Sequence, residues 1–302
     1  MSTRLILQTP LSSASALVKT FASAAPIPEP IGRIEDLVNR AAPGASGALH
    51  RITENAWRMD CIEITATTRA HIAATAEAAG IDAAFVAAGR RLSDFKLLVM
   101  DMDSTLITIE CIDEIADMHG LKPQVAAITE AAMRGELVFR ESLLRRVALL
   151  EGLDANALQR VIDERLQLSP GAETMLAAVR AAGLKTLLVS GGFTFFTQRM
   201  QARLGLDYTR ANELDIVDGK LTGRVLGEII DADAKRRTVE STCALIGAMP
   251  SQAIVMGDGA NDLAMMGIAG LSVAYRAKPV VRQKADVALN FVGLDGILAL
   301  FD

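Results

Sequence analysis

Cysteine is scarce in this chain of 302 residues, which has only three. Cys61, Cys111 and Cys243 lie far apart, form no CxxC pair and have no histidine-rich stretch beside them. An odd number at wide spacing argues against a disulfide framework and against a cysteine-rich zinc site. The pattern is typical of a protein from a reducing compartment.

Excess positive charge and long apolar runs are also absent. The formal net charge is -5 and the pI is near 5.4, so the chain has no general attraction to polyanions and we expect no nucleic-acid partner. The mean hydropathy is +0.29, and alanine accounts for much of it. No unbroken apolar stretch is long enough to span a bilayer, so we expect no membrane partner.

Acidic residues are missing from positions 1–28, where Arg4, Lys19 and several serines give a slight likeness to a transit peptide. The polar and proline residues at 8–10 interrupt the apolar core that a signal peptide requires. We therefore expect an uncleaved, cytoplasmic chain.

Residues 96–110, with the sequence KLLVMDMDSTLITIE, organise the rest of the chain. The apolar run at 97–100 predicts a strand buried on both faces, and it stops at Asp101 and Asp103. In open parallel sheets, ligands bind at the carboxyl ends of the strands. The two acids are therefore candidates for a site.

Two carboxylates separated by one residue can divide a reaction between them. Asp101 can attack phosphorus and form an acyl phosphate, while Asp103 protonates the leaving alkoxide and later accepts a proton from water. Both also offer hard oxygen ligands to a divalent cation. The alternative, for an isolated DxD, is a strand-to-loop corner in which aspartate caps a turn.

A second acidic stretch, GDGAND at residues 257–262, follows another apolar run at 253–256. Asp258 stands at the predicted strand end, as Asp101 does, and completes an all-oxygen Mg²⁺ site made of Asp101, Asp103 and Asp258. Asn261 and Asp262 open a predicted helix, where capping is the alternative role.

DMDST and GDGAND together resemble the motifs of the haloacid-dehalogenase superfamily. The order of segments from about residue 95 to 302 is similar to that of the phosphoserine phosphatases, and the resemblance does not extend to the N-terminal third. It implies Mg²⁺-dependent hydrolysis of O-phospho-L-serine through an aspartyl phosphate, the last step of serine biosynthesis. It also implies an α/β fold with a doubly wound, Rossmann-like parallel sheet and a helical cap.

The resemblance assigns further residues to the core of the site. A strand predicted at 185–189 ends in Ser190-Gly191-Gly192, where a hydroxyl and a backbone amide hold phosphoryl oxygens in this family. Lys235, at the start of a predicted helix, matches the catalytic lysine; Arg236 and Arg237 are its competitors. By the same resemblance, Asn261 contacts substrate and Asp262 orients Lys235 or a water bound to the metal.

Four helical patterns follow the first motif and predict a cap over the site, at residues 112–118, 122–133, 139–150 and 154–165. The resemblance assigns Glu110, after the β-rich LITI segment, to the substrate ammonium and Arg146 to its carboxylate. It assigns Met133 and Phe139 to the apolar floor between them. Arg145 points about 100° away on a helix, so only one of the two arginines faces the site. The alternatives are a solvated helix charge and cap core.

The N-terminal part, residues 1–90, predicts an α+β, ferredoxin-like domain that resembles the ACT-like amino-acid-binding modules. Its elements are strands at 5–8, 47–55 and 59–65 and helices at 13–24 and 68–79. Such a module suggests serine binding, and a homodimer is compatible with it. The catalytic domain is then residues 91–302, with core segments 95–116 and 169–302 and a cap at 117–168.

Two other functions stay open. One is a phosphatase or phosphotransferase of the same superfamily that acts on another small phosphomonoester. The other is a phosphoaspartate signalling receiver, which also joins a parallel sheet to an acidic pocket and a lysine. Receivers lack the acid at the position of Asp103 and have no cap.

Overall fold

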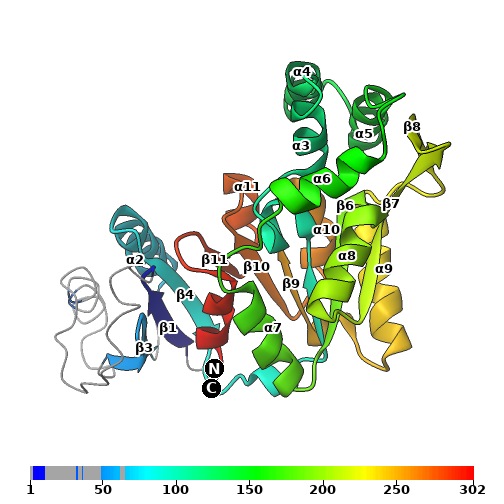
Figure 1. Cartoon of the computed structure of the whole chain (residues 1–302). Coiled ribbons are helices and arrows are strands. Elements are labelled where there is room, and N and C mark those ends of the chain that lie inside the picture. Colours follow the sequence, from blue (N-terminus) through cyan, green and yellow to red (C-terminus); the bar gives the residue numbers. More distant parts are fainter. Residues whose placement is uncertain (1–2, 11–31, 33–35, 37–48, 62–64) are drawn as a thin grey trace.

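The computed structural model describes residues 3–10, 32, 36, 49–61 and 65–302. They form a small antiparallel sheet and a larger, mostly parallel sheet, with a group of helices above the larger one (Figure 1). Among these residues, no helix combines the length and the apolar character needed to cross a membrane.

The N-terminal sheet has the strand order β2-β3-β1-β4. Its strands are β1 (Thr3–Gln8), β2 (His50–Thr53), β3 (Ala56–Cys61) and β4 (Asp82–Ala87), and helix α2 (Ala66–Ala78) precedes β4. Adjacent strands are antiparallel, as in ferredoxin-like domains. This confirms the predicted α+β class. The helix predicted at 13–24 lies outside the described residues.

Each face of the N-terminal sheet packs against a different partner. Leu5 and Leu7 point to α2, where they form a cluster with Ile72. Ile6 and Ala84 point the other way and join the large core of the second domain. This alternation is the two-residue period of a strand buried on both sides.

The seven-stranded sheet has the order β11-β10-β9-β5-β6-β7-β8. Its strands are β5 (Leu97–Met100), β6 (Lys185–Phe193), β7 (Tyr208–Val217), β8 (Lys220–Leu226), β9 (Ala253–Gly257), β10 (Leu271–Tyr275) and β11 (Val287–Leu289). All neighbouring pairs are parallel except β7–β8. The chain builds outward from β5 on both sides, which confirms the doubly wound sheet.

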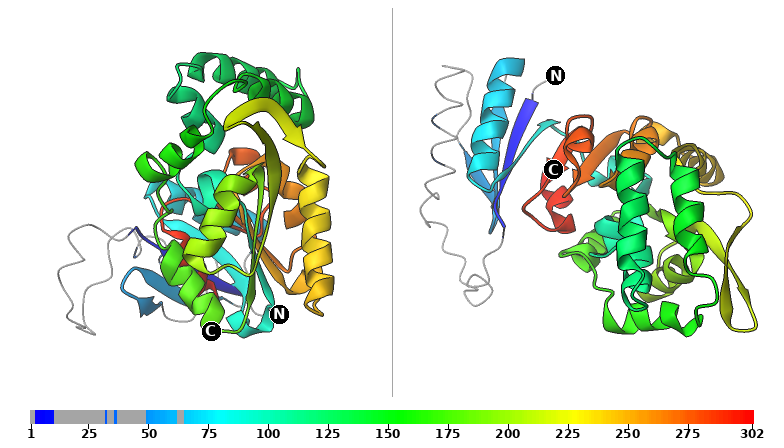
Figure 2. Two further views of the ribbon diagram at one scale, coloured as in Figure 1. Left: turned by 45° about the vertical axis from the view of Figure 1, so that its right-hand side comes forward. Right: turned by 90° about the horizontal axis from the view of Figure 1, so that it is seen from above.

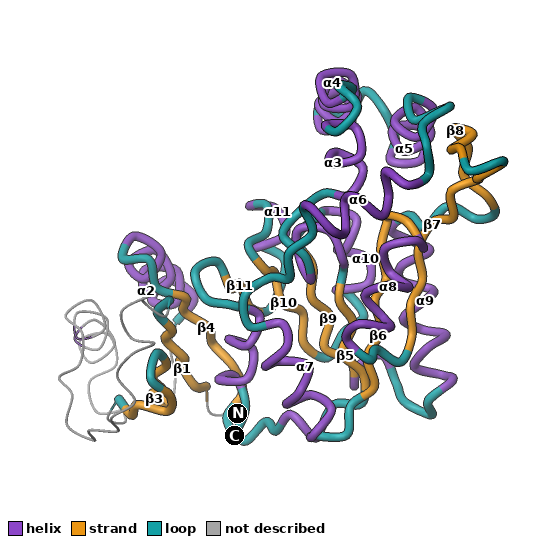
Figure 3. Tube along the Cα trace, in the orientation of Figure 1, coloured by secondary structure: helices purple, strands orange, loops and turns teal. Residues whose placement is uncertain are grey.

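Helices cover both faces of this sheet (Figure 3). They are α7 (Ala172–Ala181), α8 (Thr194–Leu204), α9 (Ala232–Leu245), α10 (Leu263–Met266) and α11 (Pro279–Arg282). Leu98 and Met100 of β5 share a cluster with Met175 of α7, whereas Leu97 and Val99 share one with α9 and α10. The apolar run of β5 is therefore buried on both faces, as predicted.

Four helices lie above the strand ends: α3 (Cys111–Asp117), α4 (Lys122–Met133), α5 (Phe139–Ala148) and α6 (Asn156–Glu164). They match the four helical patterns expected there. Figure 2 shows the β7–β8 hairpin reaching this group. Leu221 of β8 donates to Leu153 O and accepts from Gly152 N, each at 2.8 Å, so the hairpin is tied to the α5–α6 connection.

The β-rich LITI segment does not form a strand. Residues 102–106 make an irregular helical turn with Ser104 at φ +56°, and Ile107 forms only an isolated bridge to Leu168. The segment has to turn the chain from the end of β5 toward α3, and this tertiary requirement overrides the preference of β-branched residues for strands.

A polar joint connects the two sheets. Asp82, at the start of β4, accepts backbone N–H bonds from Asn290, Phe291 and Val292 at 2.7, 2.9 and 3.0 Å. These three residues follow β11, and β4 lies beside β11 (Figure 1). Both partners of this joint are well separated in sequence, so the two domains are held together by long-range contacts.

Candidate active site

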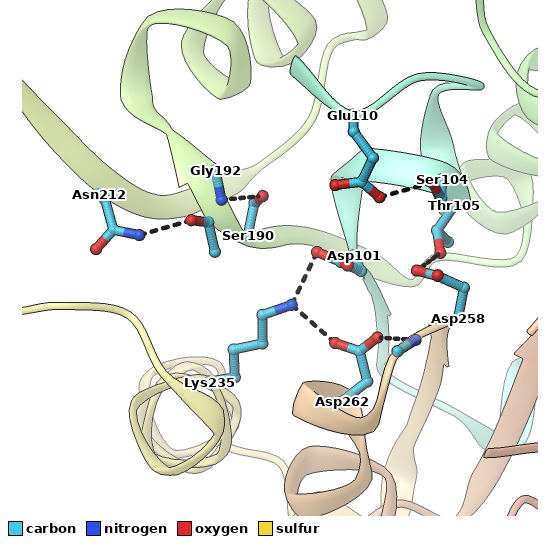
Figure 4. A network of polar contacts seen from close by, with 12 residues as sticks. Asp101, Ser104, Thr105, Glu110, Ser190, Gly192, Asn212, Lys235, Asp258 and Asp262 are labelled. Carbon is cyan, nitrogen blue, oxygen red and sulfur yellow. Dashed lines mark hydrogen bonds and ion pairs between the residues drawn. The ribbon is translucent and has the colours of Figure 1, made fainter. Parts of the chain in front are cut away.

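The ends of three neighbouring strands converge on one polar cluster (Figure 4). Asp101 follows the last residue of β5, Asp258 follows β9, and Ser190 lies within β6. Lys235 comes from the first turn of α9. The sequence motifs therefore meet at the carboxyl edge of the parallel sheet, as the strand pattern predicted.

Lys235 joins two carboxylates in the centre of the cluster. Its Nζ lies 2.8 Å from Asp101 Oδ1 and 2.7 Å from Asp262 Oδ1. Lys235 and Asp262 are fully buried, and Asp101 is 5% exposed. Burial lowers the pKa of Lys235, but the two carboxylates outweigh it and raise that pKa, so the ammonium form persists.

The glycine at 257 allows Asp262 to approach the backbone. Asp262 Oδ2 accepts the Gly259 N–H at 3.0 Å, and a Cβ on Gly257 would lie 2.3 Å from that same oxygen. A side chain at residue 257 would therefore displace Asp262 from Lys235. The GDGAND sequence positions the lysine as well as a potential metal ligand.

Asp103 follows Asp101 by two residues and is half-buried. Its carboxylate accepts hydrogen bonds from the backbone N–H and the thiol of Cys111, the first residue of α3. Its Oδ1 is buried and has no hydrogen-bond partner among the described residues. Burial, followed by the nearby charge of Glu110, raises the pKa of Asp103 to about 8. The carboxyl group is thus suited to carry a proton near neutral pH.

The donor set fits a hard divalent cation. Carboxylate oxygens of Asp101, Asp258 and Asp262 all lie within 4.8 Å of one another. Burial and the neighbouring Asp262 raise the pKa of Asp258 to about 7, and burial raises the pKa of Asp101. A cation would relieve this repulsion. The structure includes Asp262 in the group where we expected Asp103, whose role as a ligand stays a prediction.

The segment Ser190-Gly191-Gly192 lies opposite Asp101 (Figure 4). Ser190 is 1% exposed, and its Oγ accepts the Gly192 N–H at 2.8 Å. Asn212 of β7 donates from Nδ2 to Gly191 O at 2.8 Å. Asn212 was not predicted as a site residue, because the sequence shows there no more than one amide-bearing residue within a β-rich run.

The arginine of the cap that faces the site is Arg146. It is half-buried, and its charge interacts with Asp113, Glu110 and Asp103, whereas Arg145 is exposed and pairs with Glu141 at 2.6 Å. Burial lowers the pKa of Arg146, and the three acids oppose that shift. The structure thus agrees with the helical geometry that directed only one arginine inward.

The other predicted substrate contacts differ in how far they are buried. Glu110 is exposed, and Ser104 Oγ donates to its carboxylate at 2.7 Å. The Phe139 ring lies close over Gly191, since a Cβ on that glycine would be 3.0 Å from Phe139 Cζ. Asn261 is half-buried beside Gly259. Met133 ends α4, and its side chain is outside the described part of the structure.

Residues 98–267 match the family model of the haloacid dehalogenase-like hydrolases, a span that contains Asp101, Lys235, Asp258 and Asp262. The chain belongs to the haloacid dehalogenase-like hydrolase family. The match covers β5 through α10 and therefore includes every strand end that contributes to the polar cluster. The match confirms the superfamily that the DMDST and GDGAND motifs predicted, and the doubly wound sheet is consistent with it.

Individual relatives in this family are similar over large parts of the chain. A phosphoserine phosphatase of a Polaromonas species is 59% identical over 215 residues, 70% of this chain and 91% of the relative. A HAD family hydrolase from Salmonella enterica serovar Typhi has a TM-score of 0.85 at 30% identity and covers 100% of this chain and 99% of its own. A phosphoserine phosphatase structure described as a phospho-aspartyl intermediate analogue has a TM-score of 0.65 at 39% identity, covering 69% of this chain and 99% of its own.

Proposed function

We propose that this hydrolase is a phosphoserine phosphatase that cleaves O-phospho-L-serine to L-serine and phosphate. The observation that carries the proposal is the buried Asp101–Lys235–Asp262 cluster together with a half-buried Arg146 whose charge interacts with Asp103 and Glu110. The cluster suits a phosphoryl group, and the arginine suits a carboxylate. A relative named phosphoserine phosphatase is 59% identical to this chain over 215 residues, which supports the same substrate.

In the first step, a carboxylate oxygen of Asp101 attacks phosphorus and the bond from phosphorus to the seryl oxygen breaks. Asp103 gives its proton to that oxygen, which leaves as the serine hydroxyl. Water then attacks the aspartyl phosphate, Asp103 accepts a proton from it, and inorganic phosphate leaves Asp101 free. The raised pKa of Asp103 supports the acid role in the first step.

Charge neutralisation and positioning are the main demands of this reaction. Lys235 supplies a buried ammonium 2.8 Å from the nucleophile, and the Ser190–Gly192 segment supplies a hydroxyl and backbone amides. We propose Mg²⁺ as the cofactor, held by Asp101 and Asp258 together with Asp103 or Asp262; when bound, it offsets the charge of the carboxylates and the phosphate.

The non-reacting end of the substrate is the part that the cap recognises in this proposal. Arg146 grips the carboxylate in a bidentate manner, and Glu110 binds the ammonium. Phe139 and Met133 provide the apolar surface, while Asn261 contacts the substrate from the core. The charge of Arg146 interacts with Glu110 and Asp103, which supports a position of this arginine close to the proposed catalytic carboxylates.

The proposal includes the division of the chain at about residue 90 and a cap at 117–168, supported by the separate sheets and by helices α4 to α6. The strand order of the N-terminal sheet supports an ACT-like module that binds serine. The buried free thiols of Cys111 and Cys243 support a cytoplasmic location. A homodimer is the oligomeric state we propose, to be measured by sedimentation.

The test is phosphate release from O-phospho-L-serine, phosphothreonine and phosphoethanolamine with and without Mg²⁺. We expect phosphoserine to be cleaved fastest and only with the metal. Equal turnover of all three esters would favour a phosphatase of broader range. A long-lived phosphoprotein without steady release would instead identify a signalling receiver.

A further inference from the structure

Asn212 is a fully buried amide whose two polar ends are both used. Its Nδ2 donates to Gly191 O at 2.8 Å, and its Oδ1 accepts the Ile230 N–H at 2.8 Å. A buried amide is unfavourable unless it is hydrogen-bonded, so its position here is set by these two bonds. Figure 4 shows the Asn212 side chain beside the Ser190–Gly192 segment, to which we assign phosphate binding.

The bond to Gly191 replaces a missing sheet contact. Parallel pairing of β6 and β7 is regular up to Val189–Arg210 and resumes at Phe193–Asn212. Between these pairs, β6 has three residues and β7 has one, so the Ser190–Gly192 segment bulges out of the ladder. Within this bulge, the Gly191 carbonyl accepts a hydrogen bond from the Asn212 side-chain amide, so a side chain of β7 supports β6 where the strand pairing is interrupted.

This bond also fixes the next peptide plane. The Gly191 carbonyl and the Gly192 N–H belong to one planar peptide and point in opposite directions. The carbonyl is held by Asn212, and the N–H is held by Ser190 Oγ at 2.8 Å. The orientation of Ser190 is therefore determined through Asn212.

The second end of Asn212 holds the entry to α9. Ile230 precedes Asp231, which caps the helix by accepting the Ala234 N–H at 2.9 Å. Lys235 is the next residue, and its own backbone N–H donates to Asp231 O at 2.9 Å. One side chain thus spans the distance between the phosphate-binding bulge and the turn that carries the lysine.

We propose that Asn212 is a positioning residue for phosphoryl transfer, because it holds the Ser190–Gly192 segment and the start of α9 in one fixed relation. Both groups then reach the same phosphate without rearrangement. This inference rests on the proposed phosphatase function, but it concerns the phosphoryl end and not the serine end of the substrate.

The variants are Asn212→Ala, which removes both bonds, and Asn212→Asp, which keeps an acceptor for Ile230 but opposes two oxygens at Gly191. The matched control is Thr186→Val. Thr186 of β6 is buried, as Asn212 of β7 is. Its hydroxyl donates to Asp207 Oδ2 at 3.0 Å and accepts the Asp207 N–H at 2.9 Å, at the end of the sheet away from the site. Thr186→Val therefore measures how much stability is lost with a buried pair of hydrogen bonds when the residues assigned to the phosphate are unchanged.

For each variant, kcat, KM, inhibition by orthovanadate and the melting temperature are measured with O-phospho-L-serine and with p-nitrophenyl phosphate. We expect Asn212→Ala and Asn212→Asp to lower kcat about 10- to 100-fold on both esters and to weaken vanadate inhibition. Thr186→Val, at a similar loss of melting temperature, keeps kcat within about two-fold.

Unchanged kcat and vanadate inhibition in a folded Asn212→Ala protein would overturn the inference, and so would an equal loss in Thr186→Val. If Asn212→Ala is insoluble, Asn212→Ser is judged by the same criteria. Failure of the wild type on phosphoserine, with activity on p-nitrophenyl phosphate, removes the proposed substrate only. The comparison at Asn212 then proceeds on the aryl ester.

Discussion

The core residues assigned to the phosphoryl group and the residues assigned to the rest of the substrate are held differently. In the core, Asp101, Lys235 and Asp262 are buried, and each lies within 2.8 Å of an opposite charge. In the other set, Glu110 is exposed and Arg146 is half-buried, and neither forms an ion pair within the described part of the chain. Desolvated charges act strongly and do not rearrange, whereas hydrated ones act weakly and can exchange partners. The core is therefore suited to the reaction and the cap to selection.

The largest effect is expected from Asp101→Asn, which removes the nucleophile from the core. Turnover of every phosphomonoester should fall by at least ~10⁴-fold, because the amide cannot form the acyl phosphate. Phosphate release and rapid-quench trapping of a phosphorylated Asp101 peptide are the measurements. Asp94→Asn, in the short helical turn that precedes β5, is the control and should be active. Normal hydrolysis without label on Asp101 would disprove the mechanism.

A smaller loss is expected from Asp103→Asn. Both chemical steps should slow by about 10²- to 10⁴-fold, since each requires a proton transfer. In the wild type, the pKa of about 8 predicts that the phosphorylation step slows as the pH rises above that value and Asp103 loses its proton. Single-turnover rates across pH test this. If both rates and the pH profile are unaltered in the variant, Asp103 is not the acid and base.

The cap is expected to discriminate where the core does not. Arg146→Ala should reduce kcat/KM for phosphoserine about 100-fold, because a partly buried charged contact to the carboxylate is lost. The loss on phosphoethanolamine, which lacks that carboxylate, should be within a few-fold. Arg145→Ala, one residue away on the exposed face, is the control. Equal losses on both esters would remove the assignment of Arg146.

The smallest effect concerns stability without metal. The folded-state pKa values of Asp103 and Asp258, about 8 and about 7, lie above the ordinary value of 3.8. At pH values between 3.8 and about 8, the folded protein therefore binds more protons than the unfolded chain. The free energy of unfolding falls as the pH rises through that interval. The melting temperature in EDTA should decrease between about pH 5 and pH 8, and Mg²⁺ should restore it at the upper end.

Asp258→Asn is the comparison for this stability prediction. The substitution removes one of the two carboxyl groups whose pKa is raised in the folded protein. The melting temperature should then decrease less steeply with pH, and Mg²⁺ should increase it less. A core whose stability is independent of pH and of metal would contradict the picture of crowded, desolvated carboxylates.

Much of the core site could be predicted because strand ends are visible in a sequence. The apolar run before Asp101 and the one before Asp258 both end in carboxylates, and parallel strands bring such ends together. The resemblance to the family, in which the catalytic lysine has the same spacing to the GDGAND motif, favoured Lys235 over its two neighbouring arginines. Burial and the distances that create the ion cluster were not available from spacing, since they depend on how α9 packs against the sheet.

Features that depend on tertiary contacts could not be predicted from the sequence. Strand β4 was missed because its sequence, DAAFVA, is half alanine, which favours helices, and only packing on two sides makes it a strand. Asn212 was missed because the bulge that needs its amide is a mismatch between two strands. The turn in the β-rich LITI segment was not predicted either, since local β preference cannot reveal that the chain must turn there.

Strands β4 and β11 shield each other. Each is the last strand of its sheet, and open strand edges of this kind are where separate molecules add to one another. Asp82 occupies the N–H groups that follow β11 with a carboxylate, which cannot continue a ladder. The N-terminal sheet therefore covers an edge of the larger sheet that would otherwise be open to pairing with another molecule.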